Sequence, residues 1–128
     1  MSEEDNINQK LEAVLKKVLA SSREITLAII TTMEGLPIYS ILPRGYNETR
    51  LSAMVATLLS LSERSVVDMD IGIFKQIFIK GLDGYLLIFN SEQAVLAVSA
   101  TEKAKLGLVF LECERASHDI SKILKREK

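Results

Sequence analysis

The side chains most often used in catalysis are sparse in this 128-residue chain, and they are not grouped. Cys113 is the only cysteine, so neither an internal disulfide nor a cysteine-based zinc site can form. It lies on the apolar stripe of a predicted helix, where a thiol behaves as a small buried hydrophobic group. His118, the only histidine, lies on the polar side of the same helix without a serine or cysteine nucleophile arranged with it. Glu112, Glu114 and Arg115 are expected to be solvated, so we predict no catalytic residue and no metal site.

Motifs that bind phosphate groups are also absent. The chain contains neither GxxxxGK[ST] nor GxGxxG, so we expect no nucleotide or other cofactor. The run from Gly81 to Gly84 has the GxxG spacing of a KH nucleic-acid domain. It lies between two predicted strands and not between helices, however, and it has no basic neighbours, which is typical of a hairpin turn. A net charge of −1, from 16 basic and 17 acidic residues, removes the electrostatic reason to expect nucleic acid.

The stretch from Asn47 to Asp70 predicts a long helix with two non-polar sides, where a surface helix has one. The side expected to face the core contains Leu51, Met54, Val55, Leu58, Leu59, Leu61, Val66 and Met69. The opposite side contains Ser52, Ala53, Ala56, Thr57, Ser60 and Val67, with Glu63, Arg64 and Asp68 only in the later turns. Because small side chains let another backbone come close, we expect this outer side to meet a protein partner. A tolerated surface of alanine and serine is the alternative.

The rest of the chain predicts a single α+β domain over residues 1–128, in the order helix, two strands, helix, three strands, helix. The predicted helices span 5–20, 47–70 and 102–125, capped by Asp5 or Asn6, by Asn47 and by Thr101, and the strands span 25–32, 36–42, 73–80, 85–90 and 94–99. Strand 25–32 is apolar on both alternations and is expected inside the sheet, whereas Pro37 confines its neighbour to an edge. Short connections between the last three strands predict an antiparallel meander, and hence one five-stranded antiparallel sheet. Gly107 suggests close packing at the start of the last helix.

Composition and the chain's start indicate a soluble protein. Hydrophobic residues make up 48% of the sequence, enough to build a core. The first residues are polar and acidic, unlike a signal peptide, and no apolar run reaches about 18 residues. We therefore expect a cytoplasmic protein without direct membrane insertion.

The predicted strand 73–80 is a long apolar strand that pairs with its successor on one side only, unless the first hairpin covers its other side. Lysines at its ends are the main features that would discourage pairing, and unprotected edges of this kind recruit another strand. Two copies joined edge to edge would exchange several backbone hydrogen bonds, each contributing about 0.5–1.5 kcal/mol. A two-fold axis at this edge would also bring the two long helices side by side.

This element order resembles the roadblock, or dynein light chain roadblock, family. The resemblance is carried by TTMEGLPIYS in the first hairpin, LSAMVATLLSLSER in the long helix, GIFKQIFIKGLDGYLLIF in the second hairpin and KLGLVFLECERASHDI in the last helix. It implies a fold related to the longin fold, a homodimer or a heterodimer with a roadblock-type paralogue, and docking of a small Ras-like GTPase. Free-standing members similar to MglB imply a regulator of GTP hydrolysis, and others a scaffold.

The resemblance also implies which residues bind. For the GTPase it points to the long helix, at Ala53, Ala56, Thr57, Ser60 and Arg64. For the dimer it points to the edge strand, at Ile73, Phe74, Lys75, Gln76, Ile77, Phe78, Ile79 and Lys80. A catalytic arginine donated to the GTPase, from Arg44, Arg50 or Arg64, is disfavoured, because similar family members reposition the GTPase's own groups. The alternative function is a small-molecule sensor or profilin-like domain, which would need a cavity under its helices.

Overall fold

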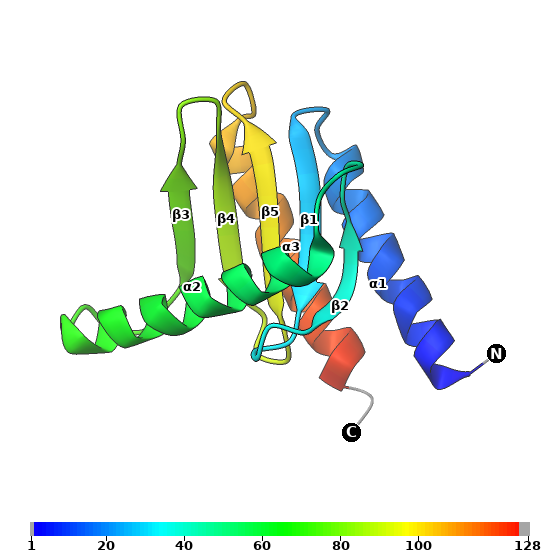
Figure 1. Ribbon diagram of the computed structural model, residues 1–128, viewed down its shortest axis with the longest axis horizontal. Helices are drawn as coiled ribbons and strands as arrows, with labels where there is room; N and C mark the ends of the chain where they lie inside the picture. The colour runs from blue at the N-terminus through cyan, green and yellow to red at the C-terminus, as the bar shows by residue number, and fades with distance from the viewer. Residues whose placement is uncertain (1, 126–128) are drawn as a thin grey trace.

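The computed structural model describes residues 2–125 and has the predicted order of helices and strands (Figure 1). The helices are α1 (Glu3–Ala20), α2 (Glu48–Asp68) and α3 (Leu106–Lys125), and the strands are β1 (Ile25–Thr31), β2 (Pro37–Ile41), β3 (Gln76–Lys80), β4 (Gly84–Asn90) and β5 (Val95–Thr101). Met1 and residues 126–128, which the predicted domain includes, lie outside the described residues.

The five strands form one antiparallel sheet in the order β2-β1-β5-β4-β3. Strand β1 lies inside the sheet between β2 and β5, as its two apolar alternations predict. Strand β2 is an edge, as Pro37 predicts, and β3, β4 and β5 form the predicted meander. The second edge is β3, so its outer side has no strand beside it.

The helices cover the two faces of the sheet unequally (Figure 1). Helices α1 and α3 pack side by side on one face, where a large core includes Leu11, Leu15, Leu96, Val98 and Ile120. Helix α2 crosses the other face alone, over a smaller core that includes Ile29, Val55, Leu59, Ile88 and Ala97. Because this core is small, much of the surface of α2 is not covered by the rest of the chain. No helix within residues 2–125 is long and apolar enough to span a membrane.

Some predicted helix starts are wrong, because other groups satisfy the backbone. Ser2, and not Asp5 or Asn6, caps α1 by accepting a hydrogen bond from the Asp5 amide at 3.1 Å. Thr101 does not cap α3: it pairs with Gly84 as the last residue of β5, and α3 begins at Leu106. The predicted cap of α2 is confirmed, since Asn47 accepts from the Arg50 amide at 3.0 Å.

The prediction of close packing at Gly107 is also wrong, because no atom beyond its chain neighbours and the adjacent backbone of α3 lies within 4 Å of the position that a Cβ atom would take there.

Candidate protein-binding surface

Helix α2 is fixed to the sheet by polar contacts near both of its ends. The Ser40 hydroxyl on β2 donates a hydrogen bond to the carboxylate of Glu48 in the first turn of the helix. Further along, the Asn90 amide at the end of β4 donates to the Glu63 carboxylate at 2.9 Å. The helix is therefore held in one orientation across the sheet, which makes its sides well defined.

The side of α2 that packs on the protein is only partly the predicted one: Val55 and Leu59 are buried as expected, and Leu51 and Leu58 are partly buried against the same core. Its buried residues are Ser52, Val55, Ala56 and Leu59, and the side chain of Ala56 is only 5% exposed. The prediction that Ser52 and Ala56 lie on the outer side is therefore wrong. As a buried residue, Ala56 offers almost no surface to a partner, unlike the other residues expected to bind a GTPase.

The small residues of α2 are used by the protein's own β1–β2 turn. In this turn Gly35 has a φ of +97°, and its amide donates to the Thr32 carbonyl at 3.0 Å. A Cβ atom on Gly35 would lie 3.1 Å from the Ala53 Cα and 3.3 Å from the Ala56 Cβ. Close approach of two backbones, which the sequence suggests for a partner, thus occurs within one chain.

A second side of α2 is apolar but exposed. Leu61 is 62% exposed and Met69, which follows the helix, is 72% exposed, while Met54 is also exposed. The prediction that these three residues belong to the core is wrong. With Leu58 and Ser65 they form a row at spacings of four, three, four and four residues, which we call the α2 stripe. Met54 is two residues from Ala56, or about 160° around the helix, so the stripe faces away from the β1–β2 turn.

Ala53, Thr57, Ser60 and Arg64 are exposed, and we call them the outer face of α2. The Thr57 hydroxyl donates to the Ala53 carbonyl one turn earlier at 2.8 Å, so it needs no partner. The Arg64 guanidinium lies 3.8 Å from the Asp68 carboxylate, and such an exposed pair contributes little to stability. This face keeps four of the five residues that the sequence points to.

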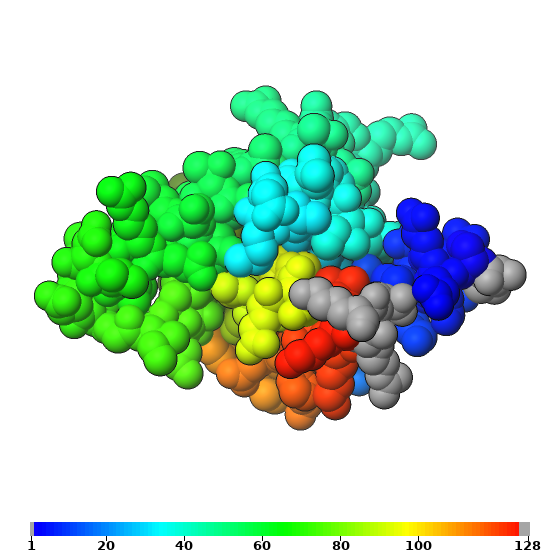
Figure 2. All heavy atoms as spheres, turned by 90° about the horizontal axis from the view of Figure 1, so that it is seen from below, coloured from blue at the N-terminus to red at the C-terminus, as the bar shows by residue number. Residues whose placement is uncertain are grey.

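The free edge of the sheet is apolar, and the end of α2 extends beyond it (Figure 1). Strand β3 begins at Gln76, so Ile73, Phe74 and Lys75 precede the strand and the prediction that they belong to it is wrong. Within the strand, Phe78 and Ile79 are exposed although both are large and apolar. Figure 2, seen from below, shows the end of α2 and the connection that follows it projecting from the rest of the molecule.

Two exposed apolar residues near this edge, Ile71 and Leu82, are not singled out by the sequence patterns. Val67, Ile71 and Ile73 surround the end of α2, and Leu82 lies at the tip of the β3–β4 turn. Ile73 is 87% exposed and Leu82 is 92% exposed. One signal could have found Leu82: it is a large apolar residue in a two-residue hairpin turn, where polar residues or glycine are usual.

A model of the Roadblock/LC7 domain matches residues 11–100, which is more than half of the chain. The chain belongs to the Roadblock/LC7 domain family. A curated relative of this Roadblock/LC7 chain is the uncharacterized protein MJ1340 of Methanocaldococcus jannaschii, which is 27% identical over 93 residues, covering 73% of this chain and 82% of that protein.

Solved structures resemble the Roadblock/LC7 chain over most of its length. MglB in a tetrameric arrangement superposes with a TM-score of 0.85 at 19% identity, covering 94% of this chain and 91% of that one. Myxococcus xanthus MglB superposes with a TM-score of 0.84 at 21% identity, covering 92% and 90%. At these identities the likeness establishes the fold, which is the predicted roadblock/longin fold.

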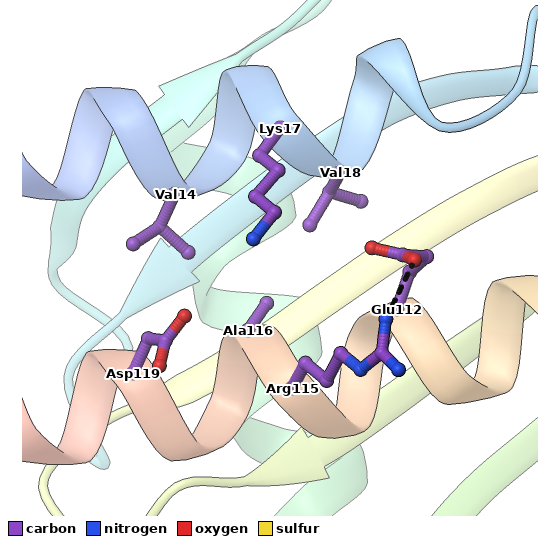
Figure 3. Close-up of a pocket in the computed structure, with 7 residues that line it drawn as sticks. All are labelled: Val14, Lys17, Val18, Glu112, Arg115, Ala116 and Asp119. Carbon is purple, nitrogen blue, oxygen red and sulfur yellow. Dashed lines mark hydrogen bonds and ion pairs between the residues drawn. The ribbon is translucent and has the colours of Figure 1, made fainter.

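The space between α1 and α3 of the Roadblock/LC7 chain is too small for a ligand (Figure 3). It measures about 10 Å³, which is about the space needed by one water molecule. Side chains of both helices point toward it, and Arg115 makes an ion pair with Glu112 at 3.5 Å beside it. A sensor needs a much larger enclosed cavity, so this space gives the small-molecule alternative no support.

Apart from the Arg115–Glu112 ion pair, the titratable groups that the sequence singles out on the described part of α3 make no side-chain hydrogen bond or ion pair with one another. Burial raises the pKa of the Cys113 thiol to about 12, so the thiol stays protonated. His118 is exposed on α3. Between β2 and α1, the Tyr39 hydroxyl donates a 2.7 Å hydrogen bond to the Glu12 carboxylate, and this bond lowers the pKa of Glu12. Among the described residues, no three His, Cys, Asp or Glu side chains are placed to hold a metal ion.

Proposed function

We propose that this Roadblock/LC7 domain is a non-catalytic module that forms a dimer and binds a small Ras-like GTPase on the outer face of its paired α2 helices. It then regulates or scaffolds that GTPase. The observation that carries the proposal is the place of the exposed apolar groups. They follow the α2 stripe and the β3 edge, and the end of α2 extends beyond that edge (Figure 1).

The dimer is supported by what a two-fold axis through β3 would do. An axis perpendicular to the sheet at this edge would continue the sheet from one copy into the next, with β3 antiparallel to its counterpart. The two α2 helices would then lie antiparallel on the same face. Each α2 stripe would point toward the other copy, because it faces away from the β1–β2 turn. Leu61 and Met69, exposed in a single chain, would become buried.

The outer face is the surface that such a dimer leaves free. It carries small side chains at Ala53, Thr57 and Ser60, with Arg64 at one end. Two antiparallel copies would double it into a flat platform. A Ras-like GTPase as the occupant is inferred from the roadblock resemblance, and the structural likeness to MglB supports it through the shared fold. A partner that meets this face would contact backbone and small groups, which suits docking better than chemistry.

Two measurements test the proposal. Sedimentation or light scattering of the purified chain should give a dimer. Small GTPases of the same cell, each loaded with GDP or GTP, should include one that the chain retains in a pulldown. Thr57→Arg should abolish this retention and leave the dimer intact, because the side chain is exposed on the outer face.

Ala13→Arg is the matched control, since it adds the same charge to an exposed position of α1. Ala56→Arg is unsuitable as a probe, because Ala56 is buried and the arginine would disturb the fold. A monomer at high concentration, or retention of a GTPase that Thr57→Arg leaves unchanged, would refute the proposal.

A further inference from the structure

The direction of the backbone groups in β3 can be worked out residue by residue. The Gly81 amide donates to the Gly84 carbonyl at 2.8 Å, so the polar groups of Gly81 face β4. In an antiparallel pair the direction alternates, so those of Ile77 and Ile79 also face β4. The amide and carbonyl groups of Gln76, Phe78 and Lys80 must then point to the free edge.

A second copy can use all three of these residues in only one register. A two-fold axis at Phe78 pairs Phe78 with Phe78 of the other copy, and Gln76 with Lys80, in both directions. Each of these pairs is of the hydrogen-bonded kind and exchanges two bonds. Moving the axis to Ile77 or Ile79 loses one of the pairs. The register at Phe78 also keeps Lys80 opposite a neutral glutamine, so like charges are not opposed.

This register has a consequence for the ends of the strand. Phe74 lies two positions before the strand and Leu82 two positions after it, so this register brings the β3–β4 turn of one copy toward the segment Ile73–Phe74 of the other. Leu82 and Ile73 are the two most exposed large apolar residues in the described chain, at 92% and 87%. Ile73 and Phe74 also line an open groove of about 460 Å³ together with Val67 of α2. The same two-fold axis therefore gives both Leu82 and Ile73, which are exposed in a single chain, an apolar neighbour in the second copy.

We infer that a second copy of this chain is clasped at both ends of the β3 seam, with Leu82 of each copy packed on Ile73 and Phe74 of the other. Glu63 and Glu92 also line the groove, and the incoming turn carries Asp83 next to Leu82, so the attraction must come from the apolar groups and not from charge. This inference rests on the proposed dimer and adds its register and its contact residues. Because of the two-fold symmetry the contact occurs twice, so each substitution acts twice.

Cross-linking tests the contact directly. Within one chain, Ile73 and Leu82 lie at opposite ends of β3, roughly 20–30 Å apart, so a disulfide between them can only join two chains. A mixture of Ile73→Cys and Leu82→Cys chains should form covalent dimers on oxidation, while either variant alone should not. The native thiol of Cys113 is buried and should not interfere. A mixture of Leu36→Cys and Leu82→Cys is the control, since Leu36 is exposed on the β1–β2 turn at the far side of the sheet.

The dissociation constant of the dimer gives a second readout. Leu82→Lys and Ile73→Glu should each weaken the dimer, Leu82→Lys by about 100-fold because two leucines lose their contacts. The chain carrying both substitutions should dimerise about tenfold more tightly than either single variant, because each lysine then meets a glutamate of the other copy. At concentrations low enough for all the proteins to be monomeric, the variants should melt at the wild-type temperature, because both positions are exposed.

The outcomes separate this inference from the proposed function. The wild-type chain could be a dimer while the single variants dimerise with dissociation constants within about twofold of the wild-type value and the mixed cross-link fails. In that case the contact of Leu82 with Ile73 and Phe74 is refuted, and the proposed function stands. If the wild-type chain is a monomer at high concentration, the proposed function fails, and this inference fails with it.

Discussion

Replacing Gly35 by alanine tests how α2 is held in place. Two separate terms should destabilise the folded chain. The φ of +97° lies in the left-handed region, where an alanine costs about 1–2 kcal/mol relative to its preferred conformations. The added Cβ would also lie 3.1 Å from the Ala53 Cα, well inside the usual contact distance. That neighbour is backbone, so the strain can be relieved only by moving α2, at a cost typical of overpacking, about 1–3 kcal/mol.

Gly45→Ala is the matched control, because Gly45 has nearly the same φ, +94°, but nothing within 4 Å of its Cβ position. The control should lose only the conformational term. The difference between the two variants therefore measures the contact with α2 and should be about 1–3 kcal/mol. For a chain of this length each kcal/mol lowers the melting temperature by about 4 °C, so Gly35→Ala should melt roughly 4–12 °C below Gly45→Ala.

The assay is thermal or urea unfolding followed by circular dichroism, with all proteins at one concentration because dimerisation adds to apparent stability. Gly35→Ala should also weaken GTPase retention more than Gly45→Ala does, since only the first displaces the helix that carries the outer face. Equal stabilities of the two variants, within about 0.5 kcal/mol, would show that the β1–β2 turn does not support α2 in the way that the distances indicate.

Four further outcomes are expected. Arg64→Ala should leave hydrolysis by a bound GTPase within a few fold, whereas a loss of roughly 10³ would identify a donated arginine. Cys113 should resist thiol reagents in the folded chain. Because its pKa is raised from 9.0 to about 12, the folded state keeps a proton that the unfolded state releases, so stability should fall as pH rises above 9 and fall less steeply in Cys113→Ala. Tyr39→Phe should raise the pKa of Glu12, measured by NMR titration, because the hydroxyl that stabilises its carboxylate is lost; an unchanged value would contradict this.

The parts of the fold that the sequence predicts correctly are those with a local cause. Pro37 has no amide hydrogen to give to a neighbouring strand, and this is enough to place β2 at an edge. The connections within the meander are too short for anything but antiparallel neighbours. Asn47 caps the long helix with its own side chain, three residues from the amide that it binds. None of these conclusions needs knowledge of a distant residue.

The errors have causes that act over longer distances. The burial of Ala56 depends on Gly35, which lies twenty-one positions earlier and reaches the helix only in the folded chain. Thr101 has the side chain of a helix cap, but it ends β5 opposite Gly84 instead, and its amide donates to the carbonyl of the distant Glu24 at 2.8 Å. Hydrophobic periodicity reports which residues share a side of a helix, and it carries no information about what covers that side.

Helix α2 shows why this matters for function. Its sequence has one strongly apolar side and one side of small residues. The simplest interpretation assigns the apolar side to the core and the small residues to a partner. In the structure the small residues Ser52 and Ala56 pack on the β1–β2 turn, while Leu61 and Met69 of the apolar side are exposed. Keeping large apolar groups in water costs about 25 cal/mol per Å², so these residues are best explained by a second surface that covers them. A helix that serves both a core and an interface must be apolar on two sides, and only the neighbours of each side in three dimensions tell the two apart.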